Sequence, residues 1–255
     1  MSVLRVSGLE KSFGSVQALS GMTFEVAAGE LFGFLGPNGA GKTTTIALVT
    51  GQLVPDSGEI SVLGVDPTEE PLEARRRVGI LPEKQSPPSF LTPREYFEFV
   101  GQIRGLEPET LADRVEEWVD RLGFRGKLDT LHTDLSRGQQ QKVMITQAFL
   151  HEPKLVCIDE PLANLDPIVQ EQVKSFLQAY CADGNTIFVS THNIEVAESI
   201  CTRVGIVADG TCLTVETLPL ADGSSLRDRF IDTVSNQEPR DMPQRVETED
   251  APTPE

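Results

Sequence analysis

Short apolar runs separated by glycine and polar residues open the chain and predict β-strands. Two of them, 3–6 and 23–26, are short, and a third, ELFGFLG at 30–36, is apolar at nearly every position. A strand that is buried on both faces of a parallel sheet has this composition. The segment KTTTIALVTGQL at 42–53 then predicts a helix. The chain therefore begins its core with a strand, a glycine-rich turn and a helix.

A block with helical periodicity follows. The segment TPRE at 92–95 has the form of a capping box with proline at the first helical position. Apolar residues then recur at spacings of three and four, first after this box and again over 111–122. Residues 138–150 predict a further helix. We therefore expect a helical subdomain at 84–152.

Buried strands return after this block. KLVCIDE at 154–160 and NTIFVSTH at 185–192 are strongly apolar, and Asp166-Pro167 between them can cap a helix. Strands that alternate with helices indicate a parallel α/β sheet. The fold class is therefore α/β, with a core formed by residues 1–83 and 153–230.

The composition changes at about Asp232. Pro, Glu, Asp, Thr and Gln dominate from there, and aromatic residues are absent. Such a segment buries too little apolar surface to offset the entropy that ordering costs. We expect one domain over residues 1–230 and an acidic, Pro-rich disordered tail over 231–255.

Composition narrows the classes of function. The formal net charge is −17, which argues against nucleic acid as the main partner, because binding to phosphates needs a basic surface. The sequence has no apolar run of about 18 residues and no secretory leader pattern, so we expect neither a membrane span nor secretion. The four cysteines contain no C-x-x-C pair, and we expect free thiols in the cytoplasm.

The strongest chemical signal is GPNGAGKT at 36–43, which fits the pattern G-x-x-x-x-G-K-[ST]. Glycines let the backbone wind tightly, so that its N–H groups and the start of the next helix face phosphate oxygens. Lys42 can neutralise the β- and γ-phosphates, and Thr43 can offer its hydroxyl to Mg²⁺. The segment predicts binding of ATP and Mg²⁺. The nucleotide-binding positions that it predicts are Gly36, Pro37, Asn38, Gly39, Ala40, Gly41, Lys42, Thr43 and Thr44.

The second signal is the pair of acids in LVCIDEP. A carboxylate at the end of a buried strand must be paired or bound to a metal. Asp159 suits a contact to Mg²⁺ or to its waters, and Glu160 could orient and deprotonate the water that attacks a γ-phosphate. An isolated Asp-Glu pair at this place would more often cap a helix or a turn. Because the phosphate loop around Lys42 is present in the same chain, the catalytic interpretation of the pair is favoured over the cap.

The third signal is LSRGQ at 135–139. Ser136 and Gly138 precede a helix, so a hydroxyl and N–H groups could bind an anion there, although Ser136 alone would more often be an ordinary helix cap. Lys42 already has an anion site in the same chain. A second anion site therefore indicates a nucleotide that is held by another subunit.

The order of these segments resembles the ATP-binding cassette (ABC) transporter ATPase family over residues 3–217. The phosphate loop comes first, and LSxGQ, the apolar run ending in Asp-Glu, a D-loop at 164–166 and a switch histidine at His192 follow. The resemblance implies a P-loop NTPase core of the RecA-like type. It also implies a mainly parallel sheet, an N-terminal antiparallel β part and the inserted helical subdomain.

The resemblance also implies roles for single residues. Phe13 would stack on adenine, Asp166 would touch a partner subunit, and His192 would reach the γ-phosphate. Taken alone, these three would more often be a core residue, a helix cap and a surface residue. The implied catalytic residues are Glu160 and His192. The implied cofactor-binding residues outside the phosphate loop are Phe13, Glu83, Ser136, Gly138, Gln139 and Asp166.

Two positions depart from the pattern of the family. Glu83 stands where the family usually has glutamine, with Gln85 as the competing assignment, and Arg137 replaces the usual glycine. A carboxylate can still ligate Mg²⁺, but it adds negative charge near the phosphates. Both departures are similar to the branch that pairs with type-2 permeases and exporters. The predicted metal contacts are Thr43, Asp159 and Glu83.

The resemblance implies an energy-coupling ATPase subunit on the inner, cytoplasmic face of the cell membrane. It would dimerise around two ATP molecules with a second copy or a homologous ATPase subunit and drive an integral membrane permease, as part of an exporter. The alternative is a soluble cassette ATPase that acts in translation or on DNA. Those relatives carry two cassettes, zinc-type cysteines or long coiled coils, and the acidity of this chain disfavours nucleic acid.

Overall fold

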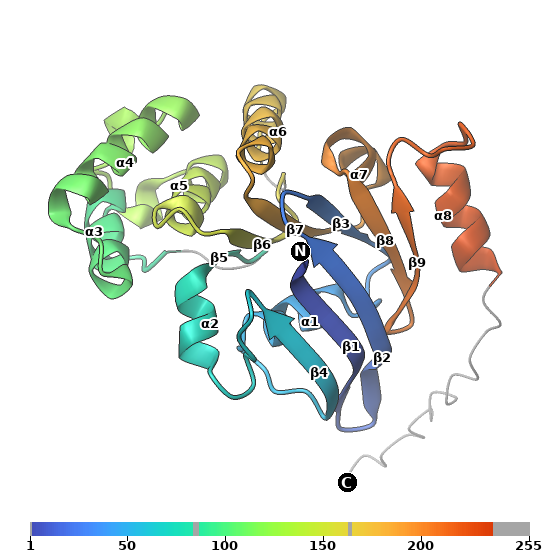
Figure 1. Cartoon of the computed structure of the whole chain (residues 1–255). Helices are drawn as coiled ribbons and strands as arrows, with labels where there is room; N and C mark the ends of the chain where they lie inside the picture. The colour runs from blue at the N-terminus through green and yellow to red at the C-terminus, as the bar shows by residue number, and fades with distance from the viewer. Residues whose placement is uncertain (1, 84–86, 163–164, 237–255) are drawn as a thin grey trace, which may run out of the picture.

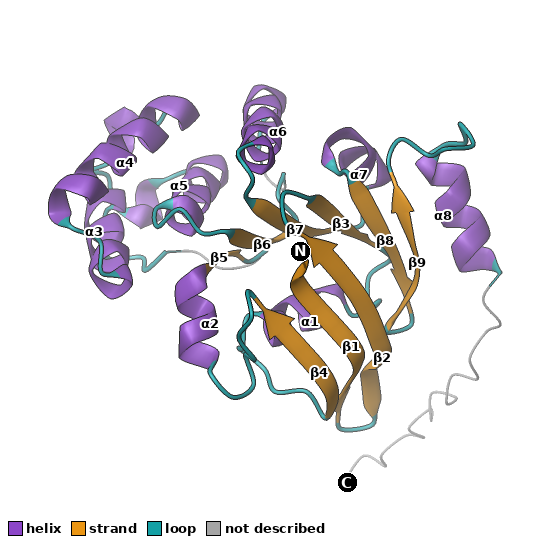
Figure 2. Cartoon of the chain, viewed as in Figure 1, coloured by secondary structure: helices purple, strands orange, loops and turns teal. Residues whose placement is uncertain are grey.

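The computed structural model describes residues 2–83, 87–162 and 165–236. The chain forms two β-sheets, with a block of helices on one side and further helices around the larger sheet (Figure 1). Figure 2 shows that the strands gather in the centre, while α3, α4 and α5 form the block at the left of the view. This is the α/β arrangement with an inserted helical part that the sequence predicts.

The larger sheet is mainly parallel and has the strand order β5-β6-β7-β3-β8-β9. Its strands are β3 (Leu31–Leu35), β5 (Val78–Leu81), β6 (Leu155–Asp159), β7 (Thr186–Thr191), β8 (Arg203–Ala208) and β9 (Thr211–Thr217). Only the last pair, β8 and β9, is antiparallel. The residues of β3, β6 and β7 are all buried, as their continuous apolar runs predict.

The smaller sheet is antiparallel, with the order β2-β1-β4. Its strands are β1 (Ser2–Phe13), β2 (Val16–Ala27) and β4 (Ser57–Val62). β1 and β2 extend well beyond the short runs at 3–6 and 23–26, because their added parts meet in a hairpin whose tip is exposed and largely polar. The added parts bury three apolar residues, Leu9, Leu19 and Met22, but register shifts interrupt the alternation there, and a ladder of backbone hydrogen bonds joins the two strands.

The helical subdomain lies between β5 and β6 in the sequence. Its helices are α3 (Pro93–Arg104), α4 (Pro108–Leu122) and α5 (Arg137–Phe149), with short 3₁₀ turns at Arg125–Lys127 and His132–Asp134. The capping box at the start of α3 is formed as predicted, since Thr92 N–H donates to Glu95 Oε2 at 2.8 Å and Glu95 N–H donates to Thr92 Oγ1 at 3.3 Å.

Two apolar cores hold these layers together. One lies between the two sheets, where the rings of Phe24, Phe32, Phe34 and Phe188 pack with centroids 4.8–6.1 Å apart. The other joins the opposite face of the parallel sheet to the helical subdomain. The helices that follow β3, β6 and β7 complete the core domain: α1 (Lys42–Val49), α6 (Pro167–Ala182) and α7 (Ile194–Ile200).

Two helices are absent from the expectations above. α2 (Pro71–Arg77) ends directly before β5, which begins at Val78. α8 (Leu226–Ser235) continues past the expected domain boundary at residue 230. Residues 237–255 of the expected tail lie outside the described residues. No described helix combines the length and the apolar character that crossing a bilayer requires.

Candidate active site

The candidate site lies where neighbouring strands of the parallel sheet end. β3, β7 and β6 are adjacent, and each leads into a predicted segment at its carboxyl end. β3 leads into the phosphate loop, β6 ends at Asp159, and β7 ends one residue before His192. Ligands of open α/β sheets bind in the crevice outside the carboxyl ends of the strands. The topology therefore brings together residues that are more than 100 positions apart in the sequence.

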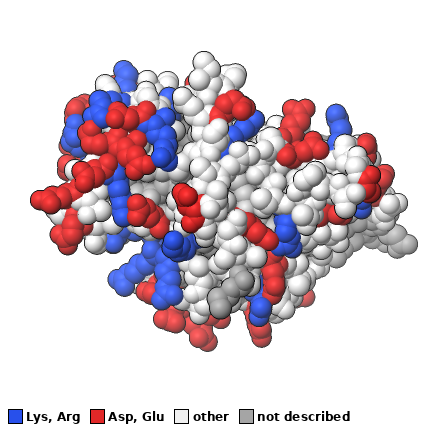
Figure 3. Space-filling model, turned by 45° about the horizontal axis from the view of Figure 1, so that its top comes forward, with Lys and Arg blue, Asp and Glu red and all other residues white. Residues whose placement is uncertain are grey.

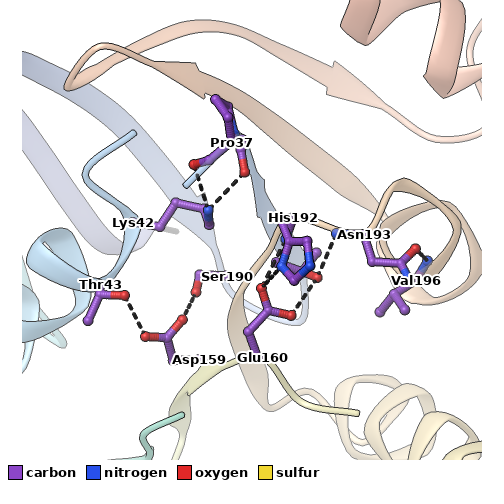
Figure 4. A network of polar contacts seen from close by, with 11 residues as sticks. Pro37, Lys42, Thr43, Asp159, Glu160, Ser190, His192, Asn193 and Val196 are labelled. Carbon is purple, nitrogen blue, oxygen red and sulfur yellow. Dashed lines mark hydrogen bonds and ion pairs between the residues drawn. The ribbon is translucent and has the colours of Figure 1, made fainter. Parts of the chain in front are cut away.

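The phosphate loop closes on the ammonium group of Lys42. Lys42 Nζ donates to the backbone oxygens of Gly36 at 2.8 Å and of Pro37 at 3.0 Å, and the residue is only 7% exposed (Figure 4). Gly41, with a φ of 93°, is the N-cap residue of α1 and makes no side-chain cap hydrogen bond to it. The N–H groups of its first turn are therefore left for an anion.

Asp159 is a buried carboxylate that two hydroxyl groups hold. Thr43 Oγ1 donates to Asp159 Oδ2 at 2.8 Å, and the Ser190 hydroxyl donates to Oδ1 (Figure 4). Asp159 is 4% exposed and stands opposite Ser190 in the sheet register. The contact between Thr43 and Asp159 places two of the predicted Mg²⁺ contacts next to each other.

Glu160 is fixed by its backbone and by its carboxylate. Its φ is 55°, and its N–H donates to the oxygen of Ser190 at 3.0 Å. The carboxylate accepts from Thr191 Oγ1 and from the His192 N–H, both at 3.0 Å, and lies 2.5 Å from His192 Nδ1 (Figure 4). A left-handed conformation at a residue other than glycine is typical of functional sites. The predicted base and the predicted switch histidine are therefore in direct contact.

One buried ammonium group, that of Lys42, is influenced by three carboxylates at the site. Burial lowers the pKa of the Lys42 ammonium below its usual range, because it penalises the charged form. Three carboxylates oppose this effect, those of Glu160, Asp159 and Glu83. The influence of Glu83 on Lys42 indicates that this residue, two positions after β5, belongs to the electrostatic surroundings of the phosphate loop.

The signature segment, LSRGQ at 135–139, lies in the helical subdomain. Ser136 is exposed and caps α5, since its Oγ accepts from Gln139 N–H at 3.3 Å, while Gln139 Oε1 accepts from Ser136 N–H at 3.0 Å. Gly138 is in the first turn of this helix. In the single chain, Ser136 therefore acts as a helix cap. Its predicted contact with a phosphate requires a nucleotide that another subunit holds.

Asp166 shows its ordinary structural role as a helix cap, whereas Phe13 is exposed and is not the core residue that a lone phenylalanine would more often be. Asp166 caps α6, because its Oδ1 accepts from Ile168 N–H at 3.1 Å and from Val169 N–H at 3.0 Å. Phe13 ends β1 and is 48% exposed, and Lys11 Nζ lies 5.7 Å from the centroid of its ring. An exposed ring is available for stacking, so the predicted contact of Phe13 with adenine stays a prediction. Gln85 and Asn164 lie outside the described residues.

Sequence reasoning missed the two hydroxyl residues at the end of β7. Ser190 donates to Asp159 and Thr191 donates to Glu160, so the two predicted carboxylates each depend on one of them. Their signal in the sequence is the pair Ser-Thr directly before His192, at the end of an apolar run. Strand order decides their role, because β7 is the neighbour of β6.

A family model described as "ABC transporter" matches residues 19–163, which is more than half of the chain. The chain belongs to the ABC transporter family. The fold class that the sequence predicts is therefore confirmed, with the P-loop core, the antiparallel β part and the helical insertion all present.

Relatives and solved structures agree with this assignment. Nod factor export ATP-binding protein I of Rhizobium sp. (strain N33) is 33% identical over 80% of this chain and 67% of its own length. Linearmycin resistance ATP-binding protein LnrL of Bacillus subtilis (strain 168) is 30% identical over 84% of this chain and 69% of its own. The chain spans only 61–66% of two further Nod factor export relatives.

A solved structure described as an ATP binding subunit of an ABC transporter superposes with a TM-score of 0.85 at 30% identity. The match covers 91% of this chain and 99% of that one. The whole described fold is therefore that of an ABC ATP-binding subunit.

The first prediction concerns Gly36, where the phosphate loop leaves β3. A Cβ added there would lie 2.2 Å from the backbone oxygen of Val207 in β8. Gly36→Ala is therefore expected to displace the loop, lower the free energy of unfolding by about 1–3 kcal/mol, and raise the dissociation constant for ATP about tenfold or more. Thermal unfolding and calorimetric titration with ATP measure the two effects.

The matched control for Gly36→Ala is Gly126→Ala. No atom lies within 4 Å of a Cβ built on Gly126, and its φ is in an ordinary region. This variant should bind ATP like the wild type. Normal ATP affinity in Gly36→Ala would show that the loop tolerates the added methyl group.

Proposed function

We propose that this chain is the ATP-hydrolysing subunit of an ABC exporter and that it drives a separate integral membrane permease. The observation that carries the proposal is the contact of Glu160 with His192 at the strand ends that also hold the phosphate loop and Asp159. The reaction is the hydrolysis of ATP to ADP and phosphate. The ATP-binding relatives named for export and for drug resistance support the direction of transport.

The residues of one chain supply most of the chemistry. The phosphate loop binds the β- and γ-phosphates through backbone N–H groups and Lys42. Glu160 accepts a proton from the attacking water and orients it, and His192 contacts the γ-phosphate while it holds the carboxylate. Phe13 stacks on the adenine ring.

Mg²⁺ fits the donor set that the chain offers. Within the described residues, no group of three or more His, Cys, Asp or Glu side chains could hold a metal ion by itself. Mg²⁺ usually keeps several waters and takes one or two protein ligands together with substrate phosphates. Thr43 and Asp159, already joined at 2.8 Å, suit that role, and Glu83 is the third candidate. The ion would neutralise charge on the phosphates when bound.

A second copy of the chain, or a homologous subunit, completes each site. The N-terminus of α5, with Ser136, Gly138 and Gln139, is exposed or half-buried and meets the γ-phosphate that the partner binds. Asp166, at the start of α6, contacts the partner near the same place. Two ATP molecules are thus enclosed between two chains, and their hydrolysis opens the dimer.

The permease docks on the helical subdomain. The outer face of α3 carries Phe99 and Ile103, which are exposed although they are large and apolar, and Phe90 is exposed just ahead of this helix. An exposed apolar patch of this kind is typical of an interaction surface. The chain therefore acts at the inner face of the cell membrane without entering the bilayer.

Complementation between two inactive variants tests whether each site spans two chains. Lys42→Ala inactivates the phosphate loop, and Ser136→Glu blocks the signature by charge. Neither variant should hydrolyse ATP alone, but a mixed dimer regains one intact site. An equimolar mixture is therefore expected to reach up to about a quarter of the wild-type rate, because half of its dimers are mixed and each holds one working site.

The readout is the release of phosphate, with ATP-driven dimerisation measured in parallel. A mixture that forms mixed dimers yet stays inactive would contradict a shared site. The association with a permease is tested by copurification of the tagged chain with a hydrophobic membrane protein. If the tagged chain copurifies with ribosomes and is absent from the membrane fraction, the transporter assignment is wrong.

A further inference from the structure

Arg137, at the first position of α5, has no hydrogen-bond or ion-pair partner among the described residues. Among the described residues, every other arginine except Arg227 donates to an oxygen or lies within 4.0 Å of a carboxylate. Arg137 is exposed and makes no such contact. Acidic and basic side chains otherwise lie interleaved at the left of the view (Figure 3). In a chain with a net charge of −17, a free guanidinium next to the signature serine is conspicuous.

Glu83 is the matching free carboxylate at the phosphate loop. Three carboxylates act electrostatically on Lys42, and two of them, Asp159 and Glu160, accept hydrogen bonds from their own chain. Glu83 is exposed, and no side chain or backbone group of the described residues donates to it. An ATP molecule in the loop adds further negative charge beside this carboxylate. A cation that arrives together with the second subunit would relieve the repulsion.

We propose that Arg137 of one chain forms an ion pair with Glu83 of the partner subunit when the ATP-loaded dimer closes. This inference rests on the proposed function, because only the shared site brings the signature of one chain to the phosphate loop of another. Arginine suits the role, since its planar fork matches a carboxylate and stays charged at all relevant pH values. Each carboxylate oxygen has two lone pairs, so a bidentate pair with arginine still leaves lone pairs that can contact Mg²⁺.

The pair accounts for two features with one contact. Glu83 adds a negative charge where a neutral glutamine is usual, and Arg137 adds a positive charge where a glycine is usual. Each change alone would unbalance the site, and together they compensate across the dimer interface. The ion pair exists only in the closed state, so it favours closure specifically and leaves the separate chains unchanged.

A double-mutant cycle tests the pair in the full-length chain. All variants carry Glu160→Gln, which keeps ATP intact, and the dissociation constant of the dimer is measured with ATP and Mg²⁺ by sedimentation. Arg137→Gln is expected to raise this constant about tenfold or more when Glu83 is present. With Glu83→Gln already in place, the same change should raise it by less than about threefold. The tenfold effect should also shrink at high salt.

The controls are Arg76→Gln and Glu69→Gln. Arg76 has an exposed side chain that lies 3.9 Å from the Glu73 carboxylate, and Glu69 is exposed with no hydrogen-bond or ion-pair partner among the described residues. Both substitutions should therefore change the dissociation constant of the dimer by less than about twofold. Equal effects of Arg137→Gln in the two Glu83 backgrounds, or none in either, would overturn the ion pair. A Glu160→Gln parent that stays monomeric with ATP would instead overturn the shared site of the proposed function.

Discussion

Glu160→Gln is expected to slow ATP hydrolysis by about 100-fold or more while ATP binding is retained, because it removes the proposed general base. The amide is nearly isosteric, and its oxygen can still accept from Thr191 Oγ1 or from the His192 N–H. The amide cannot accept the proton of the attacking water. Steady-state phosphate release measures the rate, and calorimetric titration measures the affinity for ATP.

The control for Glu160→Gln is Glu171→Gln. Glu171 is an exposed residue of α6 whose carboxylate lies 2.8 Å from Lys174 Nζ. That variant should hydrolyse ATP at the wild-type rate. Unfolding temperatures of both variants show whether the fold persists. A wild-type rate in a folded Glu160→Gln protein would mean that another group activates the water, and the contact between Glu160 and His192 would then have only a structural role.

The sequence could predict the site wherever one local rule was decisive. The phosphate loop needs glycines and a lysine at fixed spacing, and the buried run before Asp159 needs apolar residues at every position. Both signals are contained in a few consecutive residues, so one sequence is enough to find them. The structure then adds only their proximity, which the contact between Thr43 and Asp159 expresses.

Strand order was beyond the reach of the sequence pattern. Ser190 and Thr191 support the two carboxylates because β7 lies beside β6, and the sequence around them shows only a strand that ends in two hydroxyl residues. Their role is a tertiary property. Glu83 differs, because the family resemblance places it at the site, and the structure adds its electrostatic influence on Lys42.

The helix α8 could have been found. Leu226, Phe230 and Val234 recur every four residues, and Ser225 ahead of them caps the helix by accepting from Asp228 N–H at 3.1 Å. The change of composition that begins near Asp232 hides this apolar repeat, because acidic and polar residues dominate the end of the segment. A compositional boundary therefore placed the end of the domain too early by about one helical turn.

Lys42→Met is expected to raise the dissociation constant for ATP about 100-fold or more, which is about 2.8 kcal/mol, and to abolish hydrolysis. Methionine fills a similar volume, but it has no charge and no donor for the phosphates. The loss of the ammonium leaves the buried oxygen of Gly36 without this donor, which costs about 1–3 kcal/mol, whereas the oxygen of the exposed Pro37 keeps the N–H of Ala40 as a donor at 3.3 Å. The removal of a buried charge offsets part of that cost.

The pattern of these effects separates binding from folding. The lost hydrogen bonds destabilise the fold, and the removal of the buried charge stabilises it. The Met variant should therefore unfold within a few degrees of the wild type, although its affinity for ATP is much lower. Lys42→Arg keeps the charge, but its planar fork does not fit the place where one ammonium contacts two carbonyls, so it should also lose affinity. Calorimetric titration with ATP and thermal unfolding distinguish these outcomes. Tight ATP binding by a folded Met variant would show that the backbone N–H groups of the loop suffice, and that Lys42 mainly braces the loop through Gly36 and Pro37.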